Sequence, residues 1–311
     1  MADLLPLLQT AAELGLISSL TVLALFLSYS MLNVCDLSTD GCFTLGAAVG
    51  AVVAISGHPY LSILAAMGAG MLSGLVTGFL QTKLGINSLL SGIAVNTALY
   101  SVNIAVMGGS SLLNMNKTET VFTRMGAHLA ATPLAGSQKL CVAALAVLAV
   151  GTLLALFLRT RLGLAIRASG DNPDMVRSSS IDPAKTTLIG LCLSGSVTAL
   201  SGCLLAQAQK SVNIDIGSGM VTVALASLLI GGAFFGKRRR MPLRICGAVL
   251  GALLFRLVYT AALRFRLPAF MLKFVAAAIV VLTIALPYVK AQLPLIRRRF
   301  VQRKEAGDAE A

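Results

Sequence analysis

The chain has 311 residues, of which 57% are hydrophobic and only 12% charged, and its formal net charge is +13. A soluble domain carries about a quarter charged residues, so this composition excludes an ordinary soluble enzyme, and the high apolar content excludes a disordered protein. Strong positive charge would suggest nucleic-acid binding in a soluble protein. In so apolar a chain it instead indicates basic residues retained on the cytoplasmic side of a membrane.

Apolar runs recur along the chain, and a run of about 20 residues is enough to cross a bilayer. After a moderately apolar stretch, 4–11, which we expect at the membrane interface, the runs are 14–32, 43–55, 60–80, 86–107, 140–158, 186–206, 220–235, 245–263 and 270–289. Two of them, 43–55 and 220–235, are short. The sequence therefore predicts an all-α, polytopic transmembrane helical bundle of about eight to ten spans, with nine in the favoured count.

The distribution of Lys and Arg predicts the orientation of these spans. Of the 25 basic residues, five lie in 159–185, five in 237–244 and six in 290–304. Because basic residues are retained in cytoplasmic loops, we expect these three clusters and the C-terminus inside and the polar stretch 108–139 outside. Residues 1–296 then form a single transmembrane domain, and 297–311 form a cytoplasmic tail.

A weak internal repeat divides the domain into copies at about 12–140 and 186–290. In each copy a full span leads through a polar break, 33–41 or 207–219, into a short apolar run. The two breaks begin on opposite sides in the predicted topology, so the repeats are inverted. Paired interrupted segments of this kind point to the binding site of a transporter.

The breaks carry the polar residues Asp36, Asp40, Gln207, Asn213 and Asp215. A charge at membrane depth is costly and tends to face a cavity or a partner. A half-helix starting after Asp40 would present free N–H groups to the carboxylate of a small zwitterion, with an acid or a carbonyl receiving its ammonium group. The alternative is a pair of ordinary surface loops in which Asp40 only caps a helix.

A polar stripe runs along the span 86–107. Asn96, Tyr100 and Asn103 are spaced i, i+4 and i+7, which places them on one helix face. This stripe predicts a lined substrate path, and hydrogen bonding that holds the bundle together remains the alternative.

Glycines at four-residue spacing, in 70–78 and 247–251, predict close helix packing. Arg256 and Lys273 lie in or near spans, where each would neutralise an acid or extend to the interface.

The sequence offers no sign of catalysis, a cofactor or a metal. The run 231–237 fits a phosphate-binding pattern, but Arg238 stands where Ser or Thr must bind magnesium. The six cysteines lack ligand spacing, and the two histidines lie in loops. We therefore expect a protein that is not an enzyme.

The basic segment 159–185 predicts a pair of short helices between two spans, broken at 171–174. Such a pair is suited to docking a soluble partner, and a basic loop that only fixes orientation is the alternative.

This segment, Arg161-Leu-Gly163-Leu-Ala-Ile-Arg167-Ala-Ser-Gly170-Asp171-Asn172-Pro173, resembles the cytoplasmic motif of ATP-binding cassette (ABC) importer permeases of the branched-chain amino acid and simple-sugar superfamily. The similarity is greatest to the permeases described as tryptophan/tyrosine transport systems. Stretches at 32–48, 82–108 and 199–231 are also similar to that group, so the resemblance covers about 14–287. Gly232 and the stretch 210–215 depart from its pattern.

The resemblance implies a permease subunit of the bacterial inner membrane that translocates an amino acid or a related small polar or aromatic metabolite. It also implies a permease homodimer in the lipid bilayer, separate ABC ATPase subunits, an extracytoplasmic solute-binding lipoprotein and no nucleic acid. The residues that it assigns to ATPase coupling are Arg161, Gly163, Arg167, Gly170, Asp171, Asn172 and Pro173.

Two other functions remain open. One is an ion- or proton-coupled secondary transporter that uses Asp36, Asp40 and Asp215 as coupling carboxylates. The other is a membrane scaffold without transport, in which the stripe of Asn96, Tyr100 and Asn103 serves assembly only.

Overall fold

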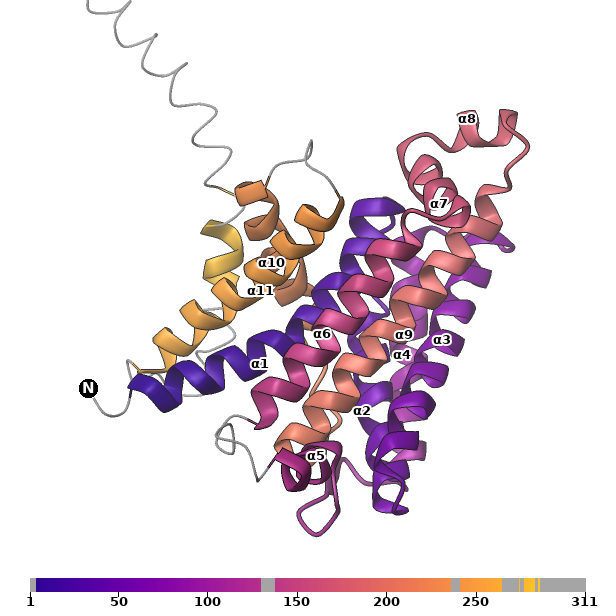
Figure 1. Ribbon diagram of the computed structural model, residues 1–311. Coiled ribbons are helices and arrows are strands. Elements are labelled where there is room, and N and C mark those ends of the chain that lie inside the picture. Colours follow the sequence, from indigo (N-terminus) through magenta and orange to yellow (C-terminus); the bar gives the residue numbers. More distant parts are fainter. Residues whose placement is uncertain are drawn as a thin grey trace, which may run out of the picture.

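The computed structural model consists almost entirely of packed helices (Figure 1). It describes residues 4–129, 138–235 and 241–264, together with residues 274, 277–282 and 285. Within these residues, six helices are long and apolar enough to cross a membrane. They are α1 (Leu4–Leu25, continued by the π-helix η1, Phe26–Met31), α3 (Pro59–Thr82), α4 (Ser88–Val106), α6 (Gln138–Phe157), α9 (Pro183–Gln209) and α11 (Met241–Arg264). The predicted all-α, polytopic membrane bundle is confirmed.

Two shorter apolar helices, α2 (Thr39–Ile55) and α10 (Met220–Phe235), correspond to the two short runs. Helix α10 has the predicted bounds, whereas α2 begins four residues before the run at 43–55 and includes the polar residues of its first turn. The stretch 4–11, expected at the membrane interface, is continuous with the rest of α1. The predicted run 270–289, with Lys273, lies largely outside the described residues, as does the tail 297–311.

Glycines determine how closely the helices of the bundle approach. On α3, a Cβ at Gly70 would overlap with the carbonyl oxygen of Gly195 in α9, and one at Gly74 would overlap with that of Leu191. On α11, a Cβ at Gly251 would overlap with the carbonyl oxygen of Ser227 in α10. The predicted close packing is therefore confirmed for both helix pairs, because only a residue without a side chain permits this backbone contact.

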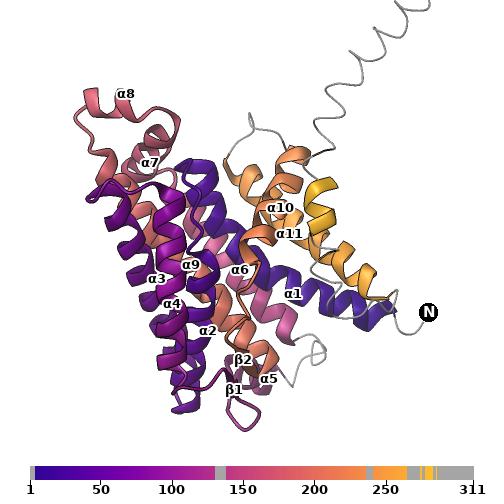
Figure 2. The ribbon, with the colours of Figure 1, turned by 180° about the vertical axis from the view of Figure 1, so that it is seen from behind.

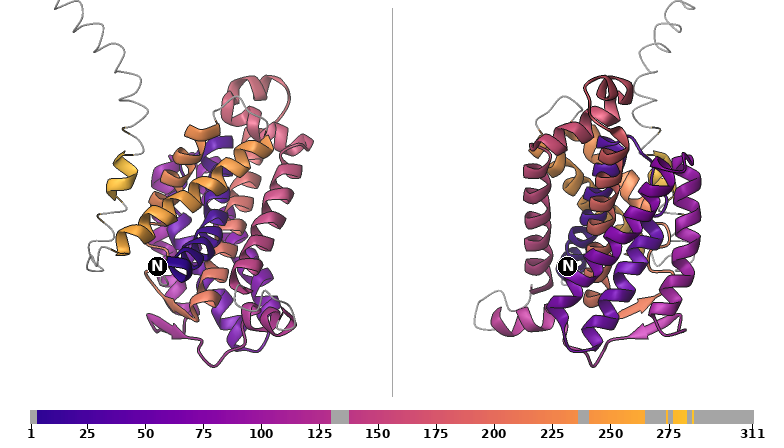
Figure 3. Two further views of the ribbon diagram at one scale, coloured as in Figure 1. Left: turned by 60° about the vertical axis from the view of Figure 1, so that its left-hand side comes forward. Right: turned by 90° about the vertical axis from the view of Figure 1, so that its right-hand side faces the viewer.

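The two ends of the molecule differ (Figures 2 and 3). At one end are α7 (Arg161–Asp171) and α8 (Pro173–Ser178), the predicted pair of short helices. At the other end are α5 (Val121–Leu129) and a two-stranded antiparallel sheet of β1 (Leu112–Asn114) and β2 (Ser211–Asn213). This sheet joins the polar stretch after α4 to the second break, a link that the sequence did not indicate.

The two breaks begin at opposite ends of the bundle, an arrangement that the predicted inverted repeat would produce. The first follows η1, whose Met31 packs against Gly170 of α7. The second follows α9 and begins in β2 at the sheet end. From each of these ends the chain runs inward before the short helix begins. The first turns of α2 and α10 therefore meet inside the bundle.

Candidate functional site

The first break is ordered by the side chain of Asp36. Its Oδ1 accepts hydrogen bonds from the backbone N–H of Ser38 at 2.9 Å and from the Ser38 hydroxyl at 2.6 Å. Thr77 of α3 donates to the same Ser38 hydroxyl at 3.2 Å. Asp36 is only 3% exposed, so its carboxylate satisfies polar groups at the start of α2, where burial without partners would be costly.

A side chain from the first break caps α10, the helix that follows the second break. The carboxylate of Asp40 accepts hydrogen bonds from the N–H groups of Gly219 at 2.9 Å and Val221 at 2.8 Å. These donors stand at the start of α10, where helix N–H groups have no partner within the helix and the dipole favours negative charge. Asp40 is thus a cap, but of α10 and not of α2, the helix in which it lies.

Small residues allow the start of α2 and the start of α10 to pack closely. A Cβ at Gly217 would overlap with the carbonyl oxygen of Asp40. Gly219 has a φ of +85°, in the left-handed region that glycine adopts without strain. The second break therefore passes directly against the first turn of α2.

A cavity of about 340 Å³ lies where the two starts meet α4. Its volume falls within the usual range for small-ligand sites. Five of the predicted substrate-path residues line it together, although they come from three separate parts of the chain. Its lining residues are Asp40, Gly41, Thr44, Asn96, Thr97, Tyr100, Asn103, Ile214, Asp215 and Ser218.

Two hydrogen-bond acceptors of the cavity have no partner among the described residues. Asn103 is 1% exposed, and its Nδ2 donates to the carbonyl oxygen of Gly41 at 3.2 Å, which leaves Oδ1 without a partner. Among the described residues, the Asp215 carboxylate also makes no hydrogen bond or ion pair. Because a buried acceptor without a donor is costly, Asn103 Oδ1 favours a ligand that donates, and the exposed Asp215 carboxylate adds a negative charge that favours a cationic ligand. The Tyr100 ring adds an aromatic surface to the same cavity.

The other predicted path residues lie elsewhere. Gln207 is 1% exposed and joins three helices, because its Nε2 donates to the Ser62 hydroxyl at 2.7 Å and its Oε1 accepts from Val121 N–H at 2.9 Å. Asn213 belongs to β2, and its side chain accepts from Asp215 N–H at 3.2 Å. Asp36, described above, does not line the cavity.

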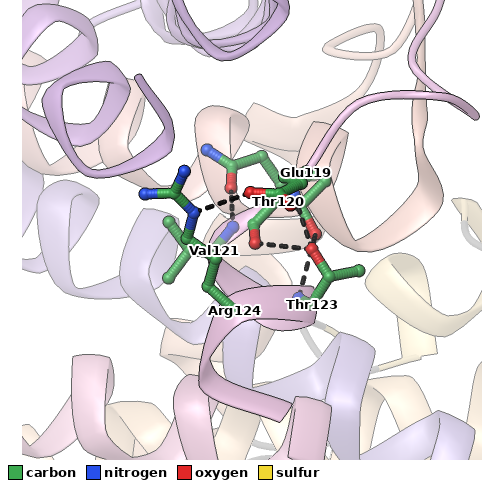
Figure 4. Close-up of polar contacts among 6 residues, drawn as sticks. Glu119, Thr120, Val121, Thr123 and Arg124 are labelled. Carbon is green, nitrogen blue, oxygen red and sulfur yellow. Dashed lines mark hydrogen bonds and ion pairs between the residues drawn. The ribbon is translucent and has the colours of Figure 1, made fainter. Parts of the chain in front are cut away.

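The bond from Gln207 reaches the start of α5, which Figure 4 shows in detail. Thr120 and Thr123 cap this helix reciprocally: Thr120 N–H donates to Oγ1 of Thr123 at 2.7 Å, and Thr123 N–H donates to Oγ1 of Thr120 at 3.2 Å. Arg124 forms an ion pair with Glu119 at 2.9 Å beside them. Gln207 therefore has a structural partner at the sheet end.

The structure adds cavity residues that the sequence reasoning missed. Thr44 lies one turn after Asp40, and Thr97 directly follows Asn96. Extending the first polar pattern by one helical turn and the second by one residue would have found them. Ser218 and Ile214 carried no comparable signal.

The predicted coupling residues lie on α7 and α8. Asn172 separates the helices, and its Oδ1 accepts from the N–H groups of Asp174 and Met175, both at 3.1 Å, while Pro173 begins α8. This is the usual arrangement of an N-cap followed by proline. Gly163 and Gly170 serve packing, since a Cβ on either would overlap with a carbonyl oxygen, of Phe157 or of Met31.

Arg256 lies on α11 with its guanidinium 5.3 Å from the ring centre of Tyr259, and its Nε has no hydrogen-bond partner. No group of three His, Cys, Asp or Glu side chains suited to a metal gathers within the described residues.

Comparison with known proteins identifies the family. The family model described as branched-chain amino acid transport system / permease component matches residues 7–284. A tyrosine transport system permease protein of Clostridioides difficile is 36% identical over 225 residues, which cover 72% of each chain. An uncharacterized protein of Rickettsia prowazekii is 31% identical over 230 residues, 73% of this chain and 78% of the other.

A ribose import permease protein of Escherichia coli K12 is 27% identical over 220 residues, 70% of this chain and 66% of the other. No solved structure matches. The resemblance drawn from the sequence motifs is therefore confirmed, and the chain belongs to the family of branched-chain amino acid transport system permease components, the membrane-spanning permeases of ABC transporters.

Proposed function

We propose that this chain is the permease subunit of an ABC importer and that the cavity between α2, α4 and the start of α10 receives its solute. The main support for this proposal is that one cavity of about 340 Å³ is lined by five of the predicted residues: Asp40, Asn96, Tyr100, Asn103 and Asp215. Placing polar groups at membrane depth costs free energy. A shared cavity in which all five contact the solute explains why they are there.

The chemistry of the cavity favours an amino acid or a related small polar or aromatic metabolite. The free acceptors, Asp215 and Asn103 Oδ1, suit a ligand's ammonium group, and Tyr100 suits an apolar or aromatic side chain. The N–H groups of Gly219 and Val221 are already engaged by Asp40. We therefore assign the carboxylate of the ligand to the hydroxyl and amide donors of Ser218 and Asn96.

Energy is supplied by a separate ATPase, to which α7 and α8 couple the bundle. Both helices expose large apolar side chains: Leu162 is 51%, Leu164 53% and Met175 67% exposed. Exposed apolar groups beyond the membrane-spanning helices suit a protein partner. We place this end and the C-terminus in the cytoplasm of a bacterial cell, because the clusters at 159–185 and 237–244 are basic.

An extracytoplasmic solute-binding lipoprotein delivers the ligand at the sheet end, and two copies of the permease form the membrane part. The ion-coupled alternative has less support, because two of its three carboxylates are engaged. Asp36 accepts from Ser38, and Asp40 accepts from the start of α10. Of these three carboxylates, only that of Asp215 has no hydrogen-bond or ion-pair partner among the described residues.

The test is purification of the tagged chain from its native membrane in mild detergent, with mass spectrometry of the co-purifying proteins. Stoichiometric recovery of an ATPase and a lipoprotein would support the importer. The assembled complex would then be reconstituted in vesicles, and uptake of amino acids and sugars compared with and without internal ATP. A homo-oligomer without an ATPase in every detergent, with uptake driven by an ion gradient, would overturn the proposal.

A further inference from the structure

A second cavity, larger than the first, lies at the end of the molecule that carries α7 and α8. Its volume is about 540 Å³, and its walls come from the end of η1, from α7 and from the first turn of α11. Its lining residues are Tyr29, Ser30, Met31, Asn33, Arg167, Gly170, Asp171 and Arg244.

Arg244 is held in place in this cavity by two contacts. Its Nη2 donates to the Ser30 hydroxyl at 3.0 Å, and its guanidinium lies 5.3 Å from the ring centre of Phe26. Neither contact neutralises its charge. An arginine fixed in this way is preorganised to bind an oxyanion, because its planar donors already point in set directions.

The charge around Arg244 is positive overall. Within the described part of the chain, Arg167 and Asp171, both on α7, are the charged groups in electrostatic range of it. Asp171 is exposed, whereas the two arginines are partly buried. Among the residues that the structure describes, neither arginine forms an ion pair. Two arginines and one exposed aspartate therefore line the cavity, which leaves a net positive charge among its described residues, and an anion from outside would stabilise this arrangement.

We propose that this cavity binds the phosphate headgroup of an anionic phospholipid from the cytoplasmic leaflet, with Arg167 and Arg244 as its ligands. The shared chemistry is that of a phosphate, which arginine binds through paired N–H donors. Basic pockets between transmembrane helices on the cytoplasmic side are known to bind such headgroups. The proposal uses the membrane orientation given above but does not depend on the transported solute.

Two observations favour a lipid over free phosphate. Helix α11, which carries Arg244, exposes Leu243, Leu250, Leu254 and Leu257, whose spacing of seven, four and three residues places them on one face, as in a lipid-facing helix. Tyr29 at the cavity is 40% exposed, and tyrosine is enriched at the headgroup level of membranes. The cavity therefore suits the lipid headgroup, and the leucine face of α11 suits its acyl chains.

The experiment is native mass spectrometry of the purified full chain in an uncharged detergent, titrated with phosphatidylglycerol or with phosphatidylcholine of the same acyl chains. We expect preferential binding of phosphatidylglycerol. The loss should be roughly fivefold for Arg167→Gln and about thirtyfold for Arg167→Gln/Arg244→Gln, since each basic residue near the surface contributes a similar factor. Binding of phosphatidylcholine should change little.

Arg177→Gln is the matched control, because Arg177 lies at the same end on α8 but is not part of the cavity. The single Arg167→Gln variant keeps the test decisive if loss of Arg244, which contacts Ser30 and Phe26, unfolds the chain. Equal phosphatidylglycerol binding by the wild type and Arg167→Gln would overturn the proposal. Displacement of the lipid by millimolar inorganic phosphate would also overturn it, since the site would then be one for free phosphate.

Discussion

The Oδ1 of Asp40 accepts a hydrogen bond from the backbone N–H of Val221 at 2.8 Å, although 181 residues separate the two positions. The bond joins the first turn of α2 to the first turn of α10, so one carboxylate holds together the two short helices that follow the breaks. That carboxylate also lines the cavity proposed for the solute. Any movement of α10 relative to α2 must therefore break or re-form this contact, which makes it a candidate gate.

Loss of this cap should destabilise the chain. We expect Asp40→Ala to lower the free energy of unfolding by about 1 kcal/mol, the usual loss when an N-cap is replaced by alanine. Asp40→Asn should lose less, because an amide oxygen still accepts one hydrogen bond. Thermal unfolding in detergent measures the change. Asp174→Asn is the control, because its side chain is 89% exposed, and an equal effect of both asparagine variants would contradict the role of Asp40.

The two free acceptors of the cavity should control the affinity for solute. We expect Asp215→Asn and Asn103→Leu each to raise the KM for uptake by about tenfold or more, because hydrogen bonds to charged groups contribute about 1.5–3 kcal/mol. The measurement is ATP-driven uptake by the reconstituted complex over a range of solute concentrations.

Glu119→Gln serves as the matched control for the charge change. Glu119 lies at the sheet end but pairs with Arg124 outside the cavity. If this control raises KM as much as Asp215→Asn does, the effect comes from surface charge and not from the cavity.

The contact between α3 and α9 should not tolerate a methyl group. A Cβ at Gly74 would overlap with the carbonyl oxygen of Leu191, whereas a Cβ at Gly68, on the same helix, would meet nothing within 4 Å. We expect Gly74→Ala to cost about 1–3 kcal/mol of stability, as overpacking does. Gly68→Ala should be neutral or slightly stabilising, since alanine favours helix over glycine. Equal melting temperatures for the two variants would contradict the packing seen here.

Coupling should depend on the exposed apolar residues of α7 and α8. We expect Leu164→Ser/Met175→Ser to reduce solute-stimulated ATP hydrolysis by the complex on the order of tenfold, because each side chain would bury apolar area in the interface. The melting temperature of the permease alone should be unchanged, since both residues are more than half exposed. Ser178→Ala on α8 is the control. Normal stimulation in the double variant would place the docking surface elsewhere.

Gly170 is unsuitable for that experiment, despite its place in the coupling motif. A Cβ there would overlap with the Met31 carbonyl oxygen, so a substitution would disturb the packing of α7 as well as any coupling. The sequence motif alone did not separate these two roles, because a glycine required for close approach looks the same as a glycine required for function.

The polar residues of the breaks illustrate what a sequence pattern can and cannot predict. Asn96, Tyr100 and Asn103 share a cavity because a helix repeats every 3.6 residues, so their spacing alone places them on one face. Gln207 and Asp36 had the same polar character, but they bond to Ser62 and Ser38 within the bundle. The partners of Gln207 lie on helices far away in the chain, so no local periodicity encodes them, whereas Asp36 bonds to a residue only two positions away.

By itself, the sequence determined the class of the protein, the number and approximate limits of its described apolar helices, the break between α7 and α8 and the glycine contacts. These features depend on local quantities: apolar length, capping residues and small-residue spacing. Only the tertiary structure decided that Asp40 caps α10, that β1 pairs with β2 and that Arg167 lies near Arg244. Each of these depends on free N–H groups, edges or charges that meet only when distant segments pack, since a bilayer interior leaves backbone polar groups no water to bind.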